Sequence, residues 1–210
     1  MITSTRSRAP SPSSRTSVRR LAGGLRALAR GLRRVPDRVL HRLRRRAAWN
    51  MLRGRGVPTL TLVVCHGNIC RSPYAAGVLS RLLEGATCAR IGSAGFDGPD
   101  RPSPPEAIAV AAGRGVDLSD HRSKLLMLHD VLSADLIVVM DAAQRRAICH
   151  GCGRRRRDVV VLGDLDPAPI AARAIRDPLN QPLHAFETSY ARIDRCLAEL
   201  VRALESPPEA

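Results

Sequence analysis

Apolar runs alternate with helix-spaced apolar positions from residue 58 onward. Short apolar runs bounded by turn residues are typical of buried strands, and apolar residues three and four apart are typical of helices that pack one face on a core. The pattern predicts strands over residues 60–64, 89–93, 136–140 and 159–162. It predicts helices over residues 73–83, 105–112, from the third strand to 148, and 183–204. This alternation indicates an α/β fold, a four-stranded parallel sheet with helices on both faces.

The first 57 residues differ from the rest of the chain in composition and in the spacing of apolar residues. The first 20 are mostly Ser, Thr, Pro and Arg, a composition with little to bury that is typical of disorder. Between residues 18 and 52, leucines and valines recur among arginines at roughly helical spacing, with Pro36 as a break. This pattern predicts two short basic amphipathic helices. We therefore divide the chain into a basic extension over 1–57, a folded domain over 58–205 and a tail over 206–210.

The charge of the chain is concentrated in this extension. The formal net charge is +15, from 34 basic and 19 acidic residues. Residues 1–57 contain 16 arginines and one acid, Asp37, which leaves 18 basic and 18 acidic residues for the rest of the chain. The predicted domain is therefore neutral, and we expect no nucleic-acid partner.

Three interpretations of the extension stay open. It is a solvated tail or an over-long start assignment, since Met51 stands just before the first strand. It is a surface-binding segment, because arginines and leucines on opposite faces over residues 18–55 suit an anionic membrane or a partner. It is a transit peptide, because it is rich in Arg and Ser and poor in acids.

The cysteines and the apolar runs bear on the compartment. Six cysteines suit a disulfide scaffold only in a short secreted chain, and the one candidate leader region, residues 21–32, is broken by Arg26 and Arg30. No run approaches the ~18 apolar residues that a membrane span needs. We expect a cytoplasmic protein, peripheral at a membrane if the extension binds lipid, with organelle targeting left open.

The segment between the first predicted strand and the first predicted helix carries the candidate chemistry. It reads Cys65-His66-Gly67-Asn68-Ile69-Cys70-Arg71-Ser72-Pro73. A strand-loop-helix junction is where a doubly wound sheet binds its ligand. There the backbone amides of the loop can converge on one anion, and the helix N-terminus adds partial positive charge. The sequence therefore predicts a phosphate-binding loop.

Individual residues of this loop have predicted roles. The amides, the helix dipole and the Arg71 guanidinium all favour the thiolate of Cys65, the nucleophile. Arg71 can hold two phosphate oxygens in its planar fork. Gly67 allows close approach of the backbone, Asn68 tolerates a left-handed conformation, and Ser72 can donate to the Cys65 sulfur. The residues expected to bind the substrate phosphate are His66, Gly67, Asn68, Ile69, Cys70 and Ser72.

The loop resembles that of the low-molecular-weight protein tyrosine phosphatases. The resemblance extends over about residues 58–204, through the stretches Ser93-Ala94-Gly95, Asp120-His121-Arg122-Ser123, Ala134-Asp135 to Met140-Asp141, and Asp177-Pro178. It implies hydrolysis of phosphotyrosine in proteins through a cysteinyl-phosphate, with neither cofactor nor metal. It also implies that Ser93 and His121 support the loop through a hydrogen-bond network with Asn68 and Ser72.

Two Asp-Pro pairs are candidates for the general acid. Asp166-Pro167 comes close after the fourth strand, whereas Asp177-Pro178 stands a few residues before the closing helix, as the acid of the family does. The resemblance therefore implies that Asp177 protonates the leaving group and then activates water. Asp166 is interpreted as a turn residue, for which an Asp-Pro pair needs no functional explanation.

The residues around the site bear on the substrate. Leu179 and Asn180 stand where eukaryotic members have aromatic residues, so the chain resembles bacterial members, several of which act with tyrosine kinases that control exopolysaccharide export. Related phosphoarginine phosphatases carry Thr at the position of Ile69, which favours the tyrosine branch. Cys70 is either a redox partner of Cys65 or a small loop hydrophobe, and both interpretations stay open.

Alternative functions rest on other features. The stretch Cys149-His150-Gly151-Cys152 is a single Cys-x2-Cys, which is weak evidence for zinc. Thioredoxin-coupled arsenate reductases share the loop and use two further cysteines, the first of which ends the third strand, where this chain has Met140. A phosphoprotein-binding or membrane-adaptor protein without activity is the other alternative. Intact Cys65, Arg71 and Asp177 favour an enzyme.

Overall fold

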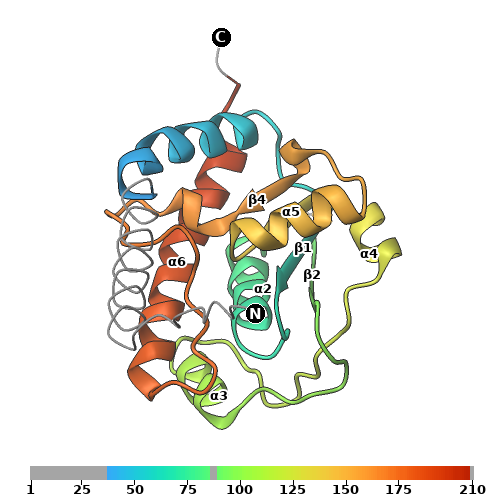
Figure 1. The fold of residues 1–210 in the computed structure, drawn as a ribbon, viewed down its shortest axis with the longest axis vertical. Helices are drawn as coiled ribbons and strands as arrows, with labels where there is room; N and C mark the ends of the chain where they lie inside the picture. The colour runs from blue at the N-terminus through green and yellow to red at the C-terminus, as the bar shows by residue number, and fades with distance from the viewer. Residues whose placement is uncertain (1–36, 86–88, 209–210) are drawn as a thin grey trace, which may run out of the picture.

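Four parallel strands form the centre of the fold. The computed structural model describes residues 37–85 and 89–208. The strands lie in the order β2-β1-β3-β4, with bounds β1 Leu60–Cys65, β2 Arg90–Gly95, β3 Leu136–Val139 and β4 Val159–Val161. All three pairings are parallel (Figure 1). The order changes direction between β1 and β3, so the carboxyl end of β1 lies at a topological switch point, where such sheets bind ligands. The α/β fold predicted from the sequence is confirmed.

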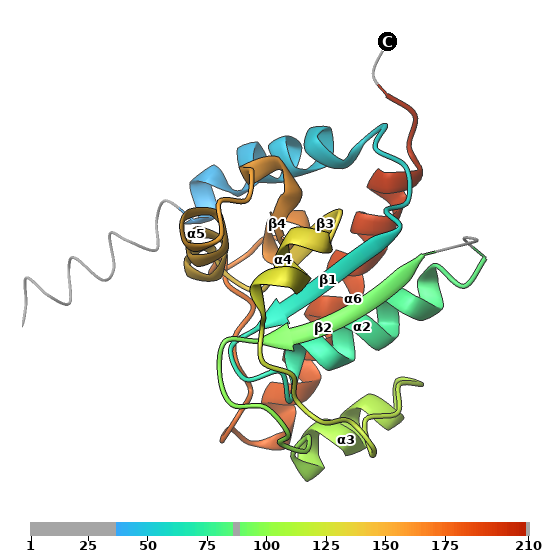
Figure 2. The ribbon, with the colours of Figure 1, turned by 90° about the vertical axis from the view of Figure 1, so that its right-hand side faces the viewer.

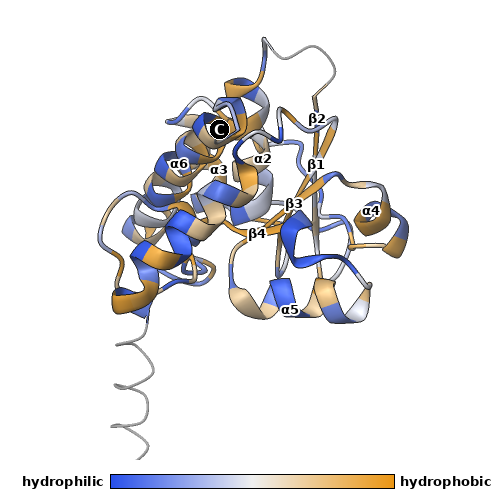
Figure 3. Cartoon of the chain, turned by 90° about the horizontal axis from the view of Figure 1, so that it is seen from above, coloured by the Kyte–Doolittle hydropathy of each residue, from blue (hydrophilic) through white to orange (hydrophobic). Residues whose placement is uncertain are grey.

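Helices cover both faces of the sheet. Successive residues of β1 point to opposite faces, so Val63 and Cys65 join one core cluster while Leu62 and Val64 join the other. The first face carries α2 (Arg71–Leu82), α3 (Pro105–Ala112) and α6 (Leu183–Glu205). The second carries α4 (Leu128–Ser133) and α5 (Ala142–Gly151), and Figure 3 shows the two groups on either side of the strands. Figure 2 shows β1 and β2 ending side by side, which places the loop after β1 at the rim of this layered body.

The sequence pattern located the four strands and the four longer helices. It missed α4 and the short 3-10 helices η1 (Arg156–Asp158) and η2 (Leu162–Leu165). Only Val131 is buried in α4, so the helix has no apolar periodicity to detect. Instead, the Asp130 carboxylate caps it by accepting the Met127 N–H at 3.1 Å.

Residues 37–52 form a helix, called here the N-terminal helix, which packs on the domain. His41, Ala48 and Leu52 are buried at helical spacing, and Leu52 belongs to the main core cluster. His41 Nε2 donates to the carbonyl of Asp166 at 2.8 Å, and Arg45 forms an ion pair with Glu199 of α6. The core therefore extends N-terminal of residue 58, and a solvated tail does not describe residues 37–57. The first predicted amphipathic helix and residues 1–20 lie outside the described residues.

The end of the chain packs against the turn after the N-terminal helix. The Gly54 N–H donates to Ser206 O at 3.0 Å, and the Arg53 side chain donates to Pro207 O at 2.7 Å. Gly54 has a φ of 72°, and a Cβ there would lie 2.8 Å from that of Pro208. Residues 206–208, expected to be a tail, therefore cover this turn.

We predict that Leu52→Ala lowers the free energy of unfolding by about 2–5 kcal/mol, because it leaves a cavity in the main core. Leu43→Ala is the matched control, since Leu43 is on the same helix and 66% exposed, and it should change the value by less than about 0.5 kcal/mol. Urea denaturation measures both. Equal values for the two variants would contradict the packing of the N-terminal helix on the domain.

Candidate active site

Cys65 ends β1, and its sulfur lies at the base of the loop over residues 66–70. The Asn68 N–H donates to Cys65 Sγ at 3.2 Å and the Ser72 hydroxyl donates at 3.1 Å. The second bond is the one expected from the sequence. Helix α2 begins at Arg71, so its free N–H groups face the same space. The sulfur thus sits where backbone donors, a hydroxyl and a helix N-terminus meet.

Asn68 is the centre of a hydrogen-bond network that holds the loop. It is buried with a φ of 51°, the left-handed conformation that Asn tolerates. Its side-chain nitrogen donates to Ser72 Oγ at 2.8 Å and to Ser93 Oγ at 2.9 Å. Its side-chain oxygen accepts the Lys124 N–H at 2.7 Å, and its backbone carbonyl accepts from His121 Nε2 at 2.7 Å. The structure thus brings together all four residues of the predicted network and adds the Lys124 backbone.

Four loop carbonyls accept hydrogen bonds from outside the loop. The pairs are His66 O with Asp97 N–H (3.0 Å), Gly67 O with Arg101 Nη2 (3.1 Å), Asn68 O with His121 Nε2 (2.7 Å) and Cys70 O with the Tyr190 hydroxyl (3.1 Å). In a trans peptide the next N–H points opposite to the C=O. These outer bonds therefore turn the N–H groups of residues 67, 68, 69 and 71 away from the donors and toward the interior of the loop.

Gly95 lets the end of β2 approach this loop. A Cβ at position 95 would lie 2.7 Å from His66 O and 2.8 Å from Asn68 N, both backbone atoms. A side chain there would push the loop out of shape. The Ser-Ala-Gly stretch therefore contributes both the Ser93 hydroxyl and the space that the loop needs.

Tyr190 connects the loop to α6, the closing helix that the apolar spacing predicts. Its ring stacks on Tyr74 with centroids 3.8 Å apart and an interplanar angle of 3°. The Tyr74 hydroxyl in turn donates to Asp194 at 2.6 Å. Burial raises the pKa of Tyr190 above its ordinary value, so the hydroxyl stays a donor to Cys70 O.

Arg71 lies between the loop and the segment that carries the predicted acid. It is 4% exposed, pairs with the Asp177 carboxylate, and donates from Nη1 to Ile175 O at 3.2 Å. Asp177 is more open, with its side chain 42% exposed, and its other oxygen accepts the Leu179 N–H at 3.3 Å. The structure therefore brings Cys65, Arg71 and Asp177 to one site, and a bound phosphate would compete with Asp177 for the guanidinium.

Cys70 lies buried beside this site. Burial raises the pKa of its thiol to about 12, and the negative charge of Asp177 adds to the effect. At neutral pH Cys70 is therefore a neutral thiol, unsuited to act as a second nucleophile.

Asp166, the other Asp-Pro candidate, lies outside this site. Its side chain is 1% exposed and pairs with Arg192 and Arg195, each through Nε at 2.8 Å. The Ala168 N–H donates to Asp166 Oδ1 at 3.2 Å, as in a turn. Asp166 is thus a turn residue, as the sequence predicts, and its carboxylate is in addition a buried ion-pair centre.

Cys149 and Cys152 do not lie where the two further cysteines of an arsenate reductase would be needed, beside the nucleophile. Both pack against the core cluster of Leu62 and Val64, on the face of the sheet opposite to Cys65. The sheet thus separates them from the candidate nucleophile. Within residues 37–85 and 89–208, no three His, Cys, Asp or Glu side chains gather as a metal site would require.

Comparison with known proteins identifies relatives of this loop and fold. The family model for low molecular weight phosphotyrosine protein phosphatase matches residues 61–208. A probable low molecular weight protein-tyrosine-phosphatase, EpsP of Ralstonia nicotianae, is 39% identical over 134 residues, 64% of this chain and 88% of that protein. Wzb of Salmonella typhi, a low molecular weight protein-tyrosine-phosphatase, is 30% identical over 69% of this chain and 93% of its own. The crystal structure of the Erwinia amylovora tyrosine phosphatase AmsI matches with a TM-score of 0.63 and 30% identity, over 70% of this chain and 94% of that one.

We predict that Asn68→Ala lowers kcat on an aryl phosphate by about 100-fold, because misplacing catalytic groups by roughly an ångström has effects of this size. Asp100→Ala is the matched control, since Asp100 has a similar backbone conformation (φ 64°) but is exposed. Steady-state kinetics on both variants, with thermal unfolding measured in parallel, separates the loss of the network from backbone strain. A similar loss of kcat in Asp100→Ala would contradict the role of the Asn68 network.

Proposed function

Because the chain belongs to the low molecular weight phosphotyrosine protein phosphatase family, we propose that it hydrolyses phosphotyrosine in proteins through a cysteinyl-phosphate on Cys65. One observation carries the residue assignment: the Cys65 sulfur accepts two hydrogen bonds at the base of a loop whose amides face inward and whose last residue is Arg71. Such a site stabilises a phosphate and the charge that develops on its oxygens during transfer. The proposed acid is Asp177.

In the first step the phosphate occupies the loop. Inward amides and the fork of Arg71 bind its oxygens, which releases the Asp177 carboxylate from its pair with Arg71. The proton that Asp177 then donates is taken up from water when the substrate binds. Cys65 Sγ attacks phosphorus opposite the leaving oxygen, so that the S–P bond forms as the P–O bond to the tyrosine breaks. Asp177 donates its proton to that oxygen, which leaves as a neutral phenol.

In the second step water attacks the cysteinyl-phosphate. Asp177, now a carboxylate, accepts a proton from the water, the new P–O bond forms, and the S–P bond breaks. The electron pair returns to Cys65 Sγ, where Ser72 and Asn68 already donate hydrogen bonds. These donors stabilise the departing sulfur, and free phosphate leaves the loop.

The geometry favours a tyrosine ester over an alkyl one. Cys65 is almost fully buried, so the phosphate must reach deep into the loop, which a phosphoryl group at the end of an aromatic ring can do. Phenols, with pKa values of about 10, are also better leaving groups than alkanols. Leu179, exposed next to the acid, offers the ring an apolar contact in place of an aromatic stack. From the resemblance to bacterial members, we place the physiological substrate among tyrosine kinases of exopolysaccharide production.

The test compares peptides carrying phosphotyrosine, phosphoserine or phosphoarginine with arsenate as substrates for the full chain. We predict the highest kcat/KM for phosphotyrosine and no activity on any of them for Cys65→Ser, which removes the nucleophile. Preference for arsenate with a thiol reductant would favour a reductase instead. Undiminished hydrolysis by Cys65→Ser would overturn the mechanism.

We also propose that the enzyme is cytoplasmic and attaches peripherally to an anionic membrane through the basic segment over residues 18–55. The outer face of the N-terminal helix supports this. Val39 and Leu43 are 68% and 66% exposed, and Arg38, Arg42 and Arg46 beside them form no ion pair with described residues. Apolar side chains flanked by arginines suit the interface of an anionic bilayer. None of the helices in the described ranges is long and apolar enough to cross a membrane.

Replacing Arg38, Arg42 and Arg46 together by Gln should weaken binding to phosphatidylserine vesicles by about 100-fold, since each charge near such a surface contributes about 1 kcal/mol. The control replaces the exposed Arg155, Arg156 and Arg157 by Gln, which removes the same charge elsewhere. Co-sedimentation with vesicles measures both, and vesicles of phosphatidylcholine give the baseline. Equal weakening by the two triple variants would argue against the helix as the attachment surface.

A further inference from the structure

The proposed acid lies on a long irregular segment. Between the end of η2 at Leu165 and the start of α6 at Leu183, the chain forms neither helix nor strand. Segments of this length are uncommon in compact domains and need side-chain anchors to hold one conformation. The position of the Asp177 carboxyl therefore depends on what fixes the residues before it.

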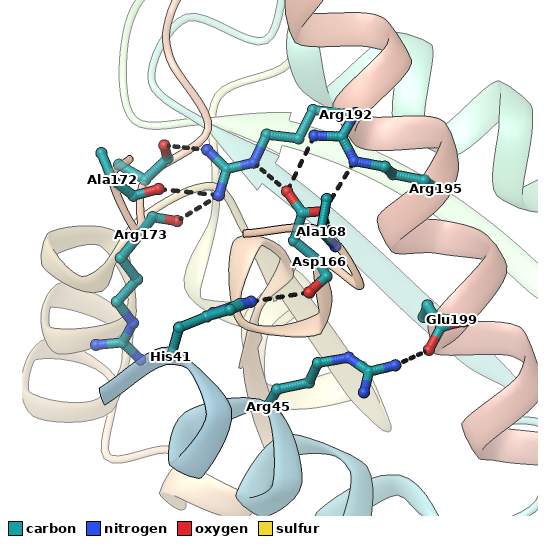
Figure 4. A network of polar contacts seen from close by, with 10 residues as sticks. His41, Arg45, Asp166, Ala168, Ala172, Arg173, Arg192, Arg195 and Glu199 are labelled. Atoms are coloured by element: carbon teal, nitrogen blue, oxygen red, sulfur yellow. Dashed lines mark hydrogen bonds and ion pairs between the residues drawn. The ribbon is translucent and has the colours of Figure 1, made fainter. Parts of the chain in front are cut away.

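Arg192 of α6 fixes this segment at two places. Its Nη1 donates to Ala174 O and its Nη2 to Ala172 O, both at 2.9 Å, while its Nε donates to Asp166 Oδ2 at 2.8 Å (Figure 4). One guanidinium therefore joins the start of the segment to the residues just before the acid. Gly163 leaves room for this arrangement, since a Cβ there would lie 2.1 Å from Arg173 O.

Asp166 holds Arg192 in place. Its carboxylate also accepts from Arg195 Nε at 2.8 Å and Nη2 at 3.1 Å. Burial opposes its ionisation, but the hydrogen bonds from Arg195 and from the Ala168 N–H outweigh this effect and lower the pKa of Asp166. Its carbonyl accepts from His41 of the N-terminal helix, as Figure 4 shows. A permanent negative charge thus orients the guanidinium that binds the segment.

Ile175 and Arg176, which lie between the contacts of Arg192 and the acid, are each fixed by hydrogen bonds. Ile175 is buried, its N–H donates to Met140 O at 3.0 Å and its carbonyl accepts from Arg71 at 3.2 Å. The carbonyl of Arg176 accepts from Ser189 Oγ at 3.0 Å. Every carbonyl from residue 174 to residue 176 is therefore bonded, and Asp177 follows directly.

We propose that Arg192 is a positioning residue for the general acid. Held by Asp166, it sets the path of residues 172–174 and so the distance from the Asp177 carboxyl to the leaving oxygen. This inference rests on the proposed function. It differs from a role in stability alone because only the proton transfers through Asp177 should depend on it, and kcat/KM reports the first of these transfers without the second.

The test uses Arg192→Met in the full chain, which keeps the apolar stem and removes the donors. General acids contribute about 10² to 10⁴-fold, so partial misplacement should lower kcat/KM on phenyl phosphate by about 10 to 100-fold. On 2,4-dinitrophenyl phosphate, whose phenolate leaves without a proton, kcat/KM should fall less than about threefold. This ratio excludes the later hydrolysis of the cysteinyl-phosphate, in which Asp177 acts as base. Arg195→Met is the matched control, because Arg195 also pairs with Asp166 but donates to no carbonyl of the segment. It should leave the ratio of the two rates close to that of the unmodified chain.

A double variant gives the decisive comparison. If Arg192 acts through the acid, Arg192→Met added to Asp177→Ala should cause almost no further loss on phenyl phosphate. Equal losses on both phosphates, or a full additional loss in the double variant, would overturn the proposal and leave the phosphatase assignment intact. Absence of activity in the unmodified chain would instead overturn the proposed function. If Arg192→Met does not fold, Arg192→Lys keeps the charge beside Asp166, loses the fork and gives the same comparison.

Discussion

The site depends on the orientation of the peptide groups between Cys65 and Arg71. An anion can be bound by backbone N–H groups only if they all face it, and each such orientation turns a carbonyl outward. A buried carbonyl without a partner costs about 1–3 kcal/mol, so the outward carbonyls need donors. Here they receive them from four parts of the chain: the turn after β2, Arg101, His121 and α6. The hydrogen bonds that the outward carbonyls accept therefore hold the inward N–H groups of the same peptides in the orientation that binds phosphate.

This requirement explains why a small motif needs the whole domain. The donors come from residues 31 to 120 positions away from the carbonyls along the chain, and only the parallel sheet brings them to the end of β1. Tyr190 illustrates the coupling, since its hydroxyl can reach Cys70 O only while its ring stacks on Tyr74 in the core between α2 and α6. The same side chain thus packs in the core and fixes the geometry of the loop.

The part of the site that could be predicted is the part in which a side chain and its neighbours in sequence determine the chemistry. Cys65, Arg71, Asn68 and Ser72 stand within one strand-loop-helix junction, and their types are informative by themselves. The further contacts of Tyr190 and Asp166 were not predicted, because a helical apolar position and an Asp-Pro pair have common structural explanations. Their partners, a loop carbonyl and two arginines 26 and 29 residues away, leave no local pattern. The N-terminal helix was predicted from its periodicity. Its packing position on the domain could not be predicted, because it depends on single contacts such as the hydrogen bond from His41 to the carbonyl of Asp166.

Arginines in this chain also donate hydrogen bonds to backbone carbonyls, a role that the net charge does not reveal. The sequence contains a single lysine, Lys124, and the domain from residue 58 is neutral, yet its arginines do more than balance acids. Arg81 and Arg192 each donate from one guanidinium to backbone carbonyls of irregular segments, and Arg154 donates to the carbonyls of Leu132 and Ala134 at the end of α4. The planar fork of arginine can join two acceptors in fixed geometry, which the ammonium of lysine does less well. Irregular segments, including the one that carries the proposed acid, are thereby held without added helix or strand. Arg71 uses the same property at the site, where in the proposed mechanism the guanidinium exchanges the Asp177 carboxylate for the phosphate. Within the domain, several arginines therefore fix the backbone.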